Sequence, residues 1–198
     1  MPEVELPNPE ELEEIKNTAF TRRVAITTAV YAVMLAIAAL GGNNAMKDML
    51  LAQQQASDQW AFYQAKVIRE HEYRIQQKRL EAELAERSAS MAPAVRQQYE
   101  GLLAEFATEA KRYNAEKKDI EQEAKTLEHE RDVNRKRDPY FDFAEVLLQI
   151  AIVLSSVSIL SSSRMMYGLS MILALCGAFL LVNGYALWTT LAFFHGRH

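Results

Sequence analysis

The chain has 198 residues, with 22 Lys and Arg against 26 Asp and Glu, and 49% of its residues are hydrophobic. The resulting net charge of −4 excludes a strongly basic nucleic-acid-binding surface, and the single cysteine, Cys176, excludes an internal disulfide and a CxxC site. The charge is unevenly distributed: residues 43–138 carry 17 basic and 18 acidic residues, whereas residues 141–198 carry two of each. Such segregation is typical of a protein that crosses a lipid bilayer.

Three uncharged runs are long enough to cross a bilayer. They begin at Val24, Val146 and Met165 and continue for 17, 18 and 30 residues, where a spanning helix needs roughly 17–25. Because backbone groups in lipid must be hydrogen-bonded within their own segment, each run predicts a helix. We therefore expect transmembrane helices over residues 24–41, 143–163 and 165–194.

Residues 43–138 predict a long antiparallel helical hairpin that resembles a coiled coil. Ala, Glu, Gln, Lys and Arg dominate this region and favour helix. Apolar residues recur every seven positions in its second half, at Tyr99, Phe106, Tyr113, Ile120 and Leu127, in a stripe that Lys117 interrupts. Pro93 suits the first turn of a helix, which predicts the turn near residues 88–93.

A fold about this midpoint pairs residue i with residue 181−i, so that Ile75 would meet Phe106 and Ile68 would meet Tyr113. The alternative is that one amphipathic arm packs against neighbouring copies of the chain. A hairpin two helices wide has a thin core, so leftover aromatic residues would be exposed unless another chain covers them. This reasoning predicts a homo-oligomer.

The ends of the spans carry their own signals. Residues 1–23 form a tail whose Asn8-Pro9 pair marks the start of a short amphipathic helix, which lies along the membrane surface or continues into the first span. Gly41 to Asn44 suggest the end of that span and the cap of the first arm. Aromatic residues at the span ends are expected to be interfacial anchors: Tyr140, Phe141, Trp188, Phe193 and Phe194.

Two charge signals disagree on the orientation in the membrane. Arg22 and Arg23, before the first span, favour a cytoplasmic N-terminus, whereas the larger number of basic residues beside the hairpin favours a cytoplasmic hairpin. Of the two we favour the cytoplasmic N-terminus, and the side of the hairpin stays open.

Motifs of catalysis are missing from the sequence, which contains no glycine-rich phosphate loop, HExxH or GxSxG. We expect no catalytic, cofactor-binding or metal-binding residues and identify no small-molecule substrate. The triplets Glu70–Glu72 and Glu128–Glu130 each surround a histidine, but adjacent helix residues point in different directions, so both are interpreted as solvated charge.

Polar residues inside the predicted spans are costly and often functional. Glu145, Gln149 and Asn183 are therefore candidates for an intramembrane polar site, with helix–helix packing as the alternative role of Asn183. Ser155, Ser156 and Ser158 add further polar groups to the second span.

One block, Ala56-Ser-Asp-Gln-Trp-Ala-Phe-Tyr-Gln-Ala-Lys66, is distinctive. With the surrounding span pattern it resembles a bacterial inner-membrane family known as a domain of unknown function (DUF4337). The resemblance implies a multi-pass protein of the bacterial inner membrane and supplies no activity. It draws attention to a candidate partner or oligomer contact formed by Asp58, Trp60, Phe62, Tyr63 and Lys66, for which packing at the base of the hairpin is the alternative.

The predicted protein is thus all-α, with three transmembrane helices and a long hairpin between the first and second. Its expected function is that of a non-enzymatic membrane scaffold or partner-binding protein that self-associates in the bilayer. One rival is an accessory subunit of a membrane transport or channel complex, with a membrane protein as its partner. The other is an oligomeric pore lined by Glu145 and the serines of the second span.

Overall fold

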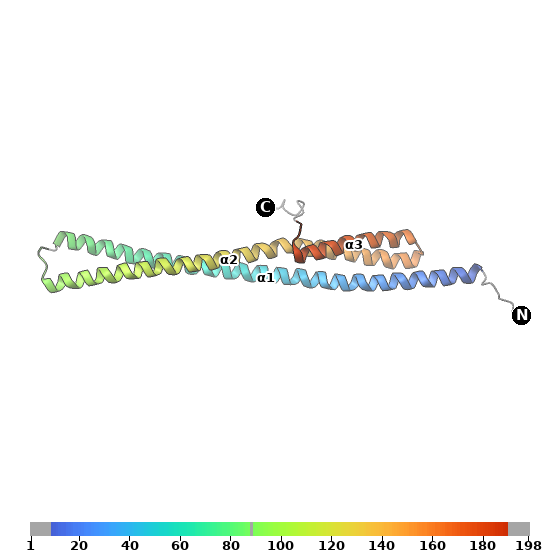
Figure 1. Ribbon diagram of the computed structural model, residues 1–198, viewed down its shortest axis with the longest axis horizontal. Helices are drawn as coiled ribbons and strands as arrows, with labels where there is room; N and C mark the ends of the chain where they lie inside the picture. Colours follow the sequence, from blue (N-terminus) through green and yellow to red (C-terminus); the bar gives the residue numbers. More distant parts are fainter. Residues whose placement is uncertain (1–8, 88, 190–198) are drawn as a thin grey trace. The chain divides into compact units, whose positions relative to one another are not determined.

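The computed structural model describes residues 9–87 and 89–189, with side chains from residue 17 onward. All regular structure in these ranges is helical: α1 Pro9–Arg87, α2 Pro93–Ser161 and α3 Arg164–Ala186 (Figure 1). The prediction of an all-α protein is confirmed. Each helix contains an 18-residue window apolar enough to cross a membrane. With 79 and 69 residues, α1 and α2 greatly exceed a single span of about 20 residues, so only part of each fits a bilayer.

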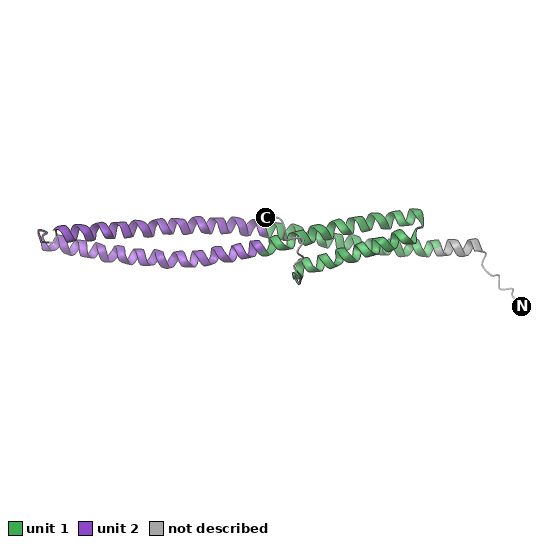
Figure 2. Ribbon diagram, turned by 90° about the horizontal axis from the view of Figure 1, so that it is seen from above, with its two compact units in different colours: residues 1–48, 133–198 green, residues 49–132 purple. Residues whose placement is uncertain are grey.

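The helices divide into two compact units, coloured separately in Figure 2. Unit 1 contains residues 1–48 and 133–198, and unit 2 contains residues 49–132.

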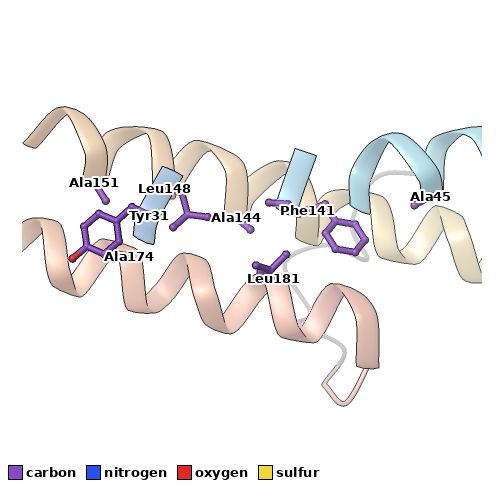
Figure 3. Close-up of a cluster of buried hydrophobic side chains, with 9 residues drawn as sticks. Tyr31, Ala45, Phe141, Ala144, Leu148, Ala151, Ala174 and Leu181 are labelled. Carbon is purple, nitrogen blue, oxygen red and sulfur yellow. The ribbon is translucent and has the colours of Figure 1, made fainter. Parts of the chain in front are cut away.

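Unit 1 packs parts of all three helices around a narrow core. Its buried cluster repeats at intervals of three, four or seven residues on each helix, the spacing of helices that cross at shallow angles. The cluster consists of Tyr31, Ala38, Ala45, Phe141, Ala144, Leu148, Ala151, Ala174 and Leu181 (Figure 3). Because most of these side chains are alanine, the three backbones approach closely.

Helix α1 continues without interruption through Gly41–Asn44, so the predicted helix cap of the first arm is wrong, while the limit of the first span at residue 41 stays a prediction. Gly41 faces the ring of Phe141, and a Cβ there would lie 2.6 Å from its Cε1 atom. The glycine therefore makes room for a neighbouring helix and does not end its own. Residues 9–23 belong to the same helix, so the tail helix runs directly into the first apolar segment, as one of the two predicted alternatives had it. Asn8 lies outside the described residues.

The predicted interfacial role of Tyr140 and Phe141 is also wrong, because both are buried inside unit 1. The ring of Phe141 makes an edge contact with Tyr185 at 4.9 Å between centroids. Trp188 is exposed, and Phe193 and Phe194 lie outside the described residues.

Helix α3 ends at Ala186, short of the predicted limit at residue 194; residues 190–194 lie outside the described part of the chain. Leu187 adopts the left-handed conformation, with φ of 50°, and its N–H donates to the carbonyl of Asn183 at 2.8 Å. The Asn183 side chain donates to the carbonyl of Thr189 at 2.9 Å and accepts from its N–H at 3.0 Å. These bonds satisfy backbone groups at the helix end that would otherwise lack partners.

Unit 2 pairs α1 with α2 in antiparallel fashion, and residues 88–92 connect the two helices. Ring contacts place Tyr73 against both Phe106 and Tyr113, each at 5.7 Å between centroids. Ile68, predicted to face Tyr113, is 60% exposed, and Ile75, predicted to face Phe106, is 39% exposed. The register is thus close to the predicted one, but α1 turns a different face toward α2, because its aromatic and charged residues occupy the contact.

Candidate functional site

The predicted contact residues on α1 divide between the inside and the outside of unit 2. Trp60 points inward: its indole Nε1 donates to Glu128 Oε1 at 3.0 Å, and its ring meets Tyr63 edge-on at 5.4 Å. Both aromatic side chains are half-buried. They therefore pack within the hairpin, as the alternative reading of this cluster expected.

Lys66 joins the two helices through an ion pair and two aromatic rings. Its Nζ lies 2.6 Å from Glu116 Oε2 and about 5 Å from the ring centroids of Phe62 and Tyr113. The hydrogen bond from Lys66 holds the pKa of the Glu116 carboxyl below its ordinary value of 4.5. The ammonium group thus has both an anion and π-faces as partners.

Asp58 and Phe62 lie on the outside of the same helix. Asp58 is exposed, and 52% of Phe62 is exposed although one face of its ring contacts Lys66. The five predicted contact residues therefore do not form one continuous surface. Asp58 and Phe62 are exposed, whereas Trp60, Tyr63 and Lys66 are half-buried.

A buried carboxylate in unit 2 was missed by the sequence analysis. Glu70, interpreted as solvated, is only 5% exposed. Its two oxygens contact Lys117 Nζ at 2.5 Å and Arg74 Nη2 at 2.6 Å. The sequence feature that could have predicted this buried carboxylate is Lys117, which interrupts the apolar stripe of α2. An inward-facing lysine requires an acid from the opposing helix.

A second missed cluster surrounds Tyr113, whose side chain is buried. Arg69 Nη1 and Arg112 Nη2 donate to its phenol oxygen at 3.5 and 3.1 Å. The bond from Arg69 and the charges of both arginines lower the pKa of Tyr113 below its ordinary value of 10.0. Because Arg69 lies on α1 and Tyr113 on α2, the Arg69 contact links the two helices through polar groups, whereas Arg112 contacts Tyr113 within α2.

The three predicted polar candidates of the apolar segments, Glu145, Gln149 and Asn183, do not form one site. Gln149 Nε2 donates to Glu145 Oε1 at 3.1 Å, one turn away on α2, with Gln149 on the outer surface of unit 1. Asn183 is buried and occupied by the cap of α3. Asn183 therefore has a structural role, and Glu145 and Gln149 form a separate pair.

A buried hydroxyl cluster lies between α2 and α3 in unit 1. Ser155 Oγ donates to Ser170 Oγ at 3.1 Å, and Ser158 Oγ donates to the carbonyl of Ser155 at 2.7 Å. All three serines are fully buried, whereas Ser156 is exposed. The buried hydroxyl of Tyr31 from α1 lies beside Ser170 without a hydrogen bond of good geometry. Ser170 was not anticipated from the sequence.

These features define a class: an all-α protein with three helices that each contain a membrane-length apolar segment, and a charge-rich helical pair between the first and second segments. The chain belongs to the family described as a domain of unknown function (DUF4337), whose sequence pattern matches residues 20–187. The family predicted from the Ala56–Lys66 block is thereby confirmed. No curated protein and no solved structure matches the chain.

Proposed function

We propose that this chain is an integral protein of the bacterial inner membrane that crosses the bilayer three times and acts as a non-enzymatic, self-associating scaffold. The spans lie in the apolar parts of α1, α2 and α3, and unit 2 forms the extramembrane part. The proposed orientation has the N-terminus in the cytoplasm, because Arg22 and Arg23 precede the first span and basic residues beside a span favour the cytoplasmic side.

The observation that carries this proposal is the inverted polarity of unit 1. Large apolar side chains on all three helices are between 43% and 66% exposed: Ile26, Val30, Val33, Ile37, Val146, Ile150, Val153, Ile172, Leu175 and Phe179. Alanine and the hydroxyls of Ser155 and Ser170 lie inside. A soluble monomer rarely exposes a continuous apolar patch larger than a few hundred Å², whereas lipid favours large apolar side chains outside and small residues between helices.

The hydroxyl groups of half-buried Thr28 and exposed Ser156 support the same proposal. Thr28 Oγ1 donates to the carbonyl of Val24 at 2.8 Å, and Ser156 Oγ donates to the carbonyl of Ile152 at 3.0 Å. Each hydroxyl is thus satisfied within its own helix and needs no water.

The contacts of unit 2 support the proposed scaffold role. Charged and aromatic side chains join α1 to α2 at Lys66–Glu116, Glu70–Lys117 and Trp60–Glu128, and other ion pairs form within one helix. The depression beside Arg69, Tyr73 and Phe106 is open to the surroundings, and it also contains Glu72. Such a surface suits contact with another macromolecule better than enclosure of a small molecule.

Membrane integration is tested by expressing the chain and washing the isolated membranes at alkaline pH. The protein should remain in the pellet and enter solution only with detergent. Recovery of a homogeneous folded protein in buffer without detergent would overturn the proposal.

The topology is tested with a Ser90→Cys variant in a Cys176→Ala background, because Ser90 lies in the connection between α1 and α2. An impermeant thiol reagent should label this variant from outside intact spheroplasts, and Asn17→Cys only after lysis. The opposite pattern would place the N-terminus outside, and labelling of neither site before lysis would contradict a three-span arrangement.

The accessory-subunit alternative is distinguished by mass. Light scattering of the detergent-solubilised chain, expressed alone, should show a uniform oligomer if it is a self-associating scaffold. A monomer that forms complexes only with another membrane protein would favour the accessory role. The pore alternative receives less support, because Ser155 and Ser158 point into the bundle of one chain.

A further inference from the structure

Exposed apolar side chains in unit 2 gather on α1. The large ones are Leu50, Leu51, Phe62, Ile68 and Ile75, whereas the described part of α2 in this unit exposes only Val95. Two helices that shared the same aqueous surroundings would have outer faces of similar polarity. The asymmetry therefore marks α1 as the helix that contacts something further.

Four of the exposed residues on α1 form one row, named here the Ile68 row: Leu50, Ala61, Ile68 and Ile75. Their separations are 11, 7 and 7 residues, and each step returns to within about 20° of the same direction around a helix. Glu70 contacts Lys117 of α2 and lies two residues from Ile68, which is about 160° away around the helix. The Ile68 row thus lies on the far side of α1 from the contact with α2.

We infer that the Ile68 row is the docking surface for a second copy of this chain, with α1 against α1 in parallel and Ile68 against Ile68 of the partner subunit. The inference rests on the proposed function, because copies inserted in one membrane share one orientation. The seven-residue spacing of Ala61, Ile68 and Ile75 matches the heptad with which two parallel helices wind into a left-handed pair, and the row supplies one inward position of each heptad.

Charge complementarity favours a parallel second copy as the occupant. One flank of the row carries three acids, Asp58, Glu72 and Glu83, with one base, Arg79, and the other flank carries His71 and Lys78. All of these side chains are exposed. In a parallel pair each flank faces the opposite flank of the partner, so acid meets base. In an antiparallel pair like flanks would meet and the acidic residues would repel one another.

Disulfide trapping in native membranes tests the inference. The Ile68→Cys and Ile75→Cys variants, each in a Cys176→Ala background, are compared with Ala115→Cys, which is exposed on α2 near the level of Ile68. With a mild oxidant, the two row variants should form covalent dimers about tenfold faster than Ala115→Cys, because a disulfide requires Cα atoms within roughly 7 Å. Equal or faster crosslinking at Ala115 would overturn the inference.

Charge variants provide a second readout with separate outcomes. Glu72→Lys should lower the oligomer fraction measured by light scattering, and Lys78→Glu in the same chain should restore it. An oligomer that is unaffected by Ile68→Glu would refute the Ile68 row but leave the scaffold proposal intact. A monomeric wild-type chain would refute both, and crosslinking of the row variants only to a different protein would refute self-docking.

Discussion

The ring of Phe141 on α2 occupies the space that a side chain at position 41 of α1 would need. A Cβ on Gly41 would lie 2.6 Å from Cε1 of the ring, and a Cβ on Gly184 of α3 would lie 2.9 Å from the same atom. A buried aromatic ring is therefore held between two glycines of neighbouring helices in unit 1. The close approach of the three backbones depends on this arrangement.

Gly41→Ala should destabilise unit 1 by about 1–3 kcal/mol, because the added methyl group overpacks the core. Thermal unfolding in mild detergent, followed by circular dichroism, should show a lower midpoint. Gly168→Ala is the matched control, since a Cβ there meets nothing within 4 Å. Combining Gly41→Ala with Phe141→Leu should recover part of the loss, and a Gly41→Ala variant as stable as the control would contradict the close contact.

Much of the architecture follows from the sequence because long apolar helical segments and charged helical segments leave strong compositional signals. Uncharged runs and charge segregation predict three apolar helical segments, and Pro93 marks a helix start. The predicted helix end at Gly41–Asn44 is absent. Two glycines and two asparagines have the same composition whether they end a helix or make room for a neighbouring helix, so composition alone does not separate the two roles. Only the position of Phe141, a hundred residues from Gly41 in sequence, separates the two roles.

The interior of unit 2 was harder to predict for a different reason. An apolar stripe indicates the inward face only when apolar residues fill the contact, and in this pair Glu70 and Lys117 occupy it. Ile68, which the pattern directed inward, is exposed as a result. A buried ion pair carries no apolar signal, so the face of α1 could not be read from periodicity alone.

Replacing Glu70 with alanine should lower the stability of unit 2 by about 1.5–3 kcal/mol, because the variant leaves the half-buried ammonium of Lys117 without its anion. Urea unfolding of the detergent-solubilised chain measures the change. Glu105→Ala, at an exposed position of α2, should change stability by less than about 0.5 kcal/mol. Equal effects at the two positions would show that Glu70 is not a buried partner.

The stability of unit 2 should fall in acid as Glu116 becomes protonated. Lys66 holds the folded-state pKa of Glu116 below 4.5, so the unfolded chain binds more protons in this range and stability increases with pH. The contribution is complete above pH 4.5 and disappears as the pH falls through the lowered value. Unfolding midpoints measured from pH 6 to pH 3 should therefore drop less steeply in Lys66→Met than in wild type. Identical slopes would mean that the ion pair does not form.

The two neighbouring serines of the second apolar segment should respond oppositely to enlargement. Ser155 is fully buried and bonded to Ser170, whereas Ser156 is exposed on the outer face of unit 1. Ser155→Leu should destabilise the bundle by about 1–3 kcal/mol through overpacking, while Ser156→Leu should be tolerated in lipid or detergent. Ser155→Ala separates size from bonding, because loss of one hydrogen bond between membrane helices costs only about 0.6 kcal/mol. Thermal midpoints of the three variants give the comparison, and a destabilised Ser156→Leu beside an unaffected Ser155→Leu would mean that α2 turns its opposite face to α3.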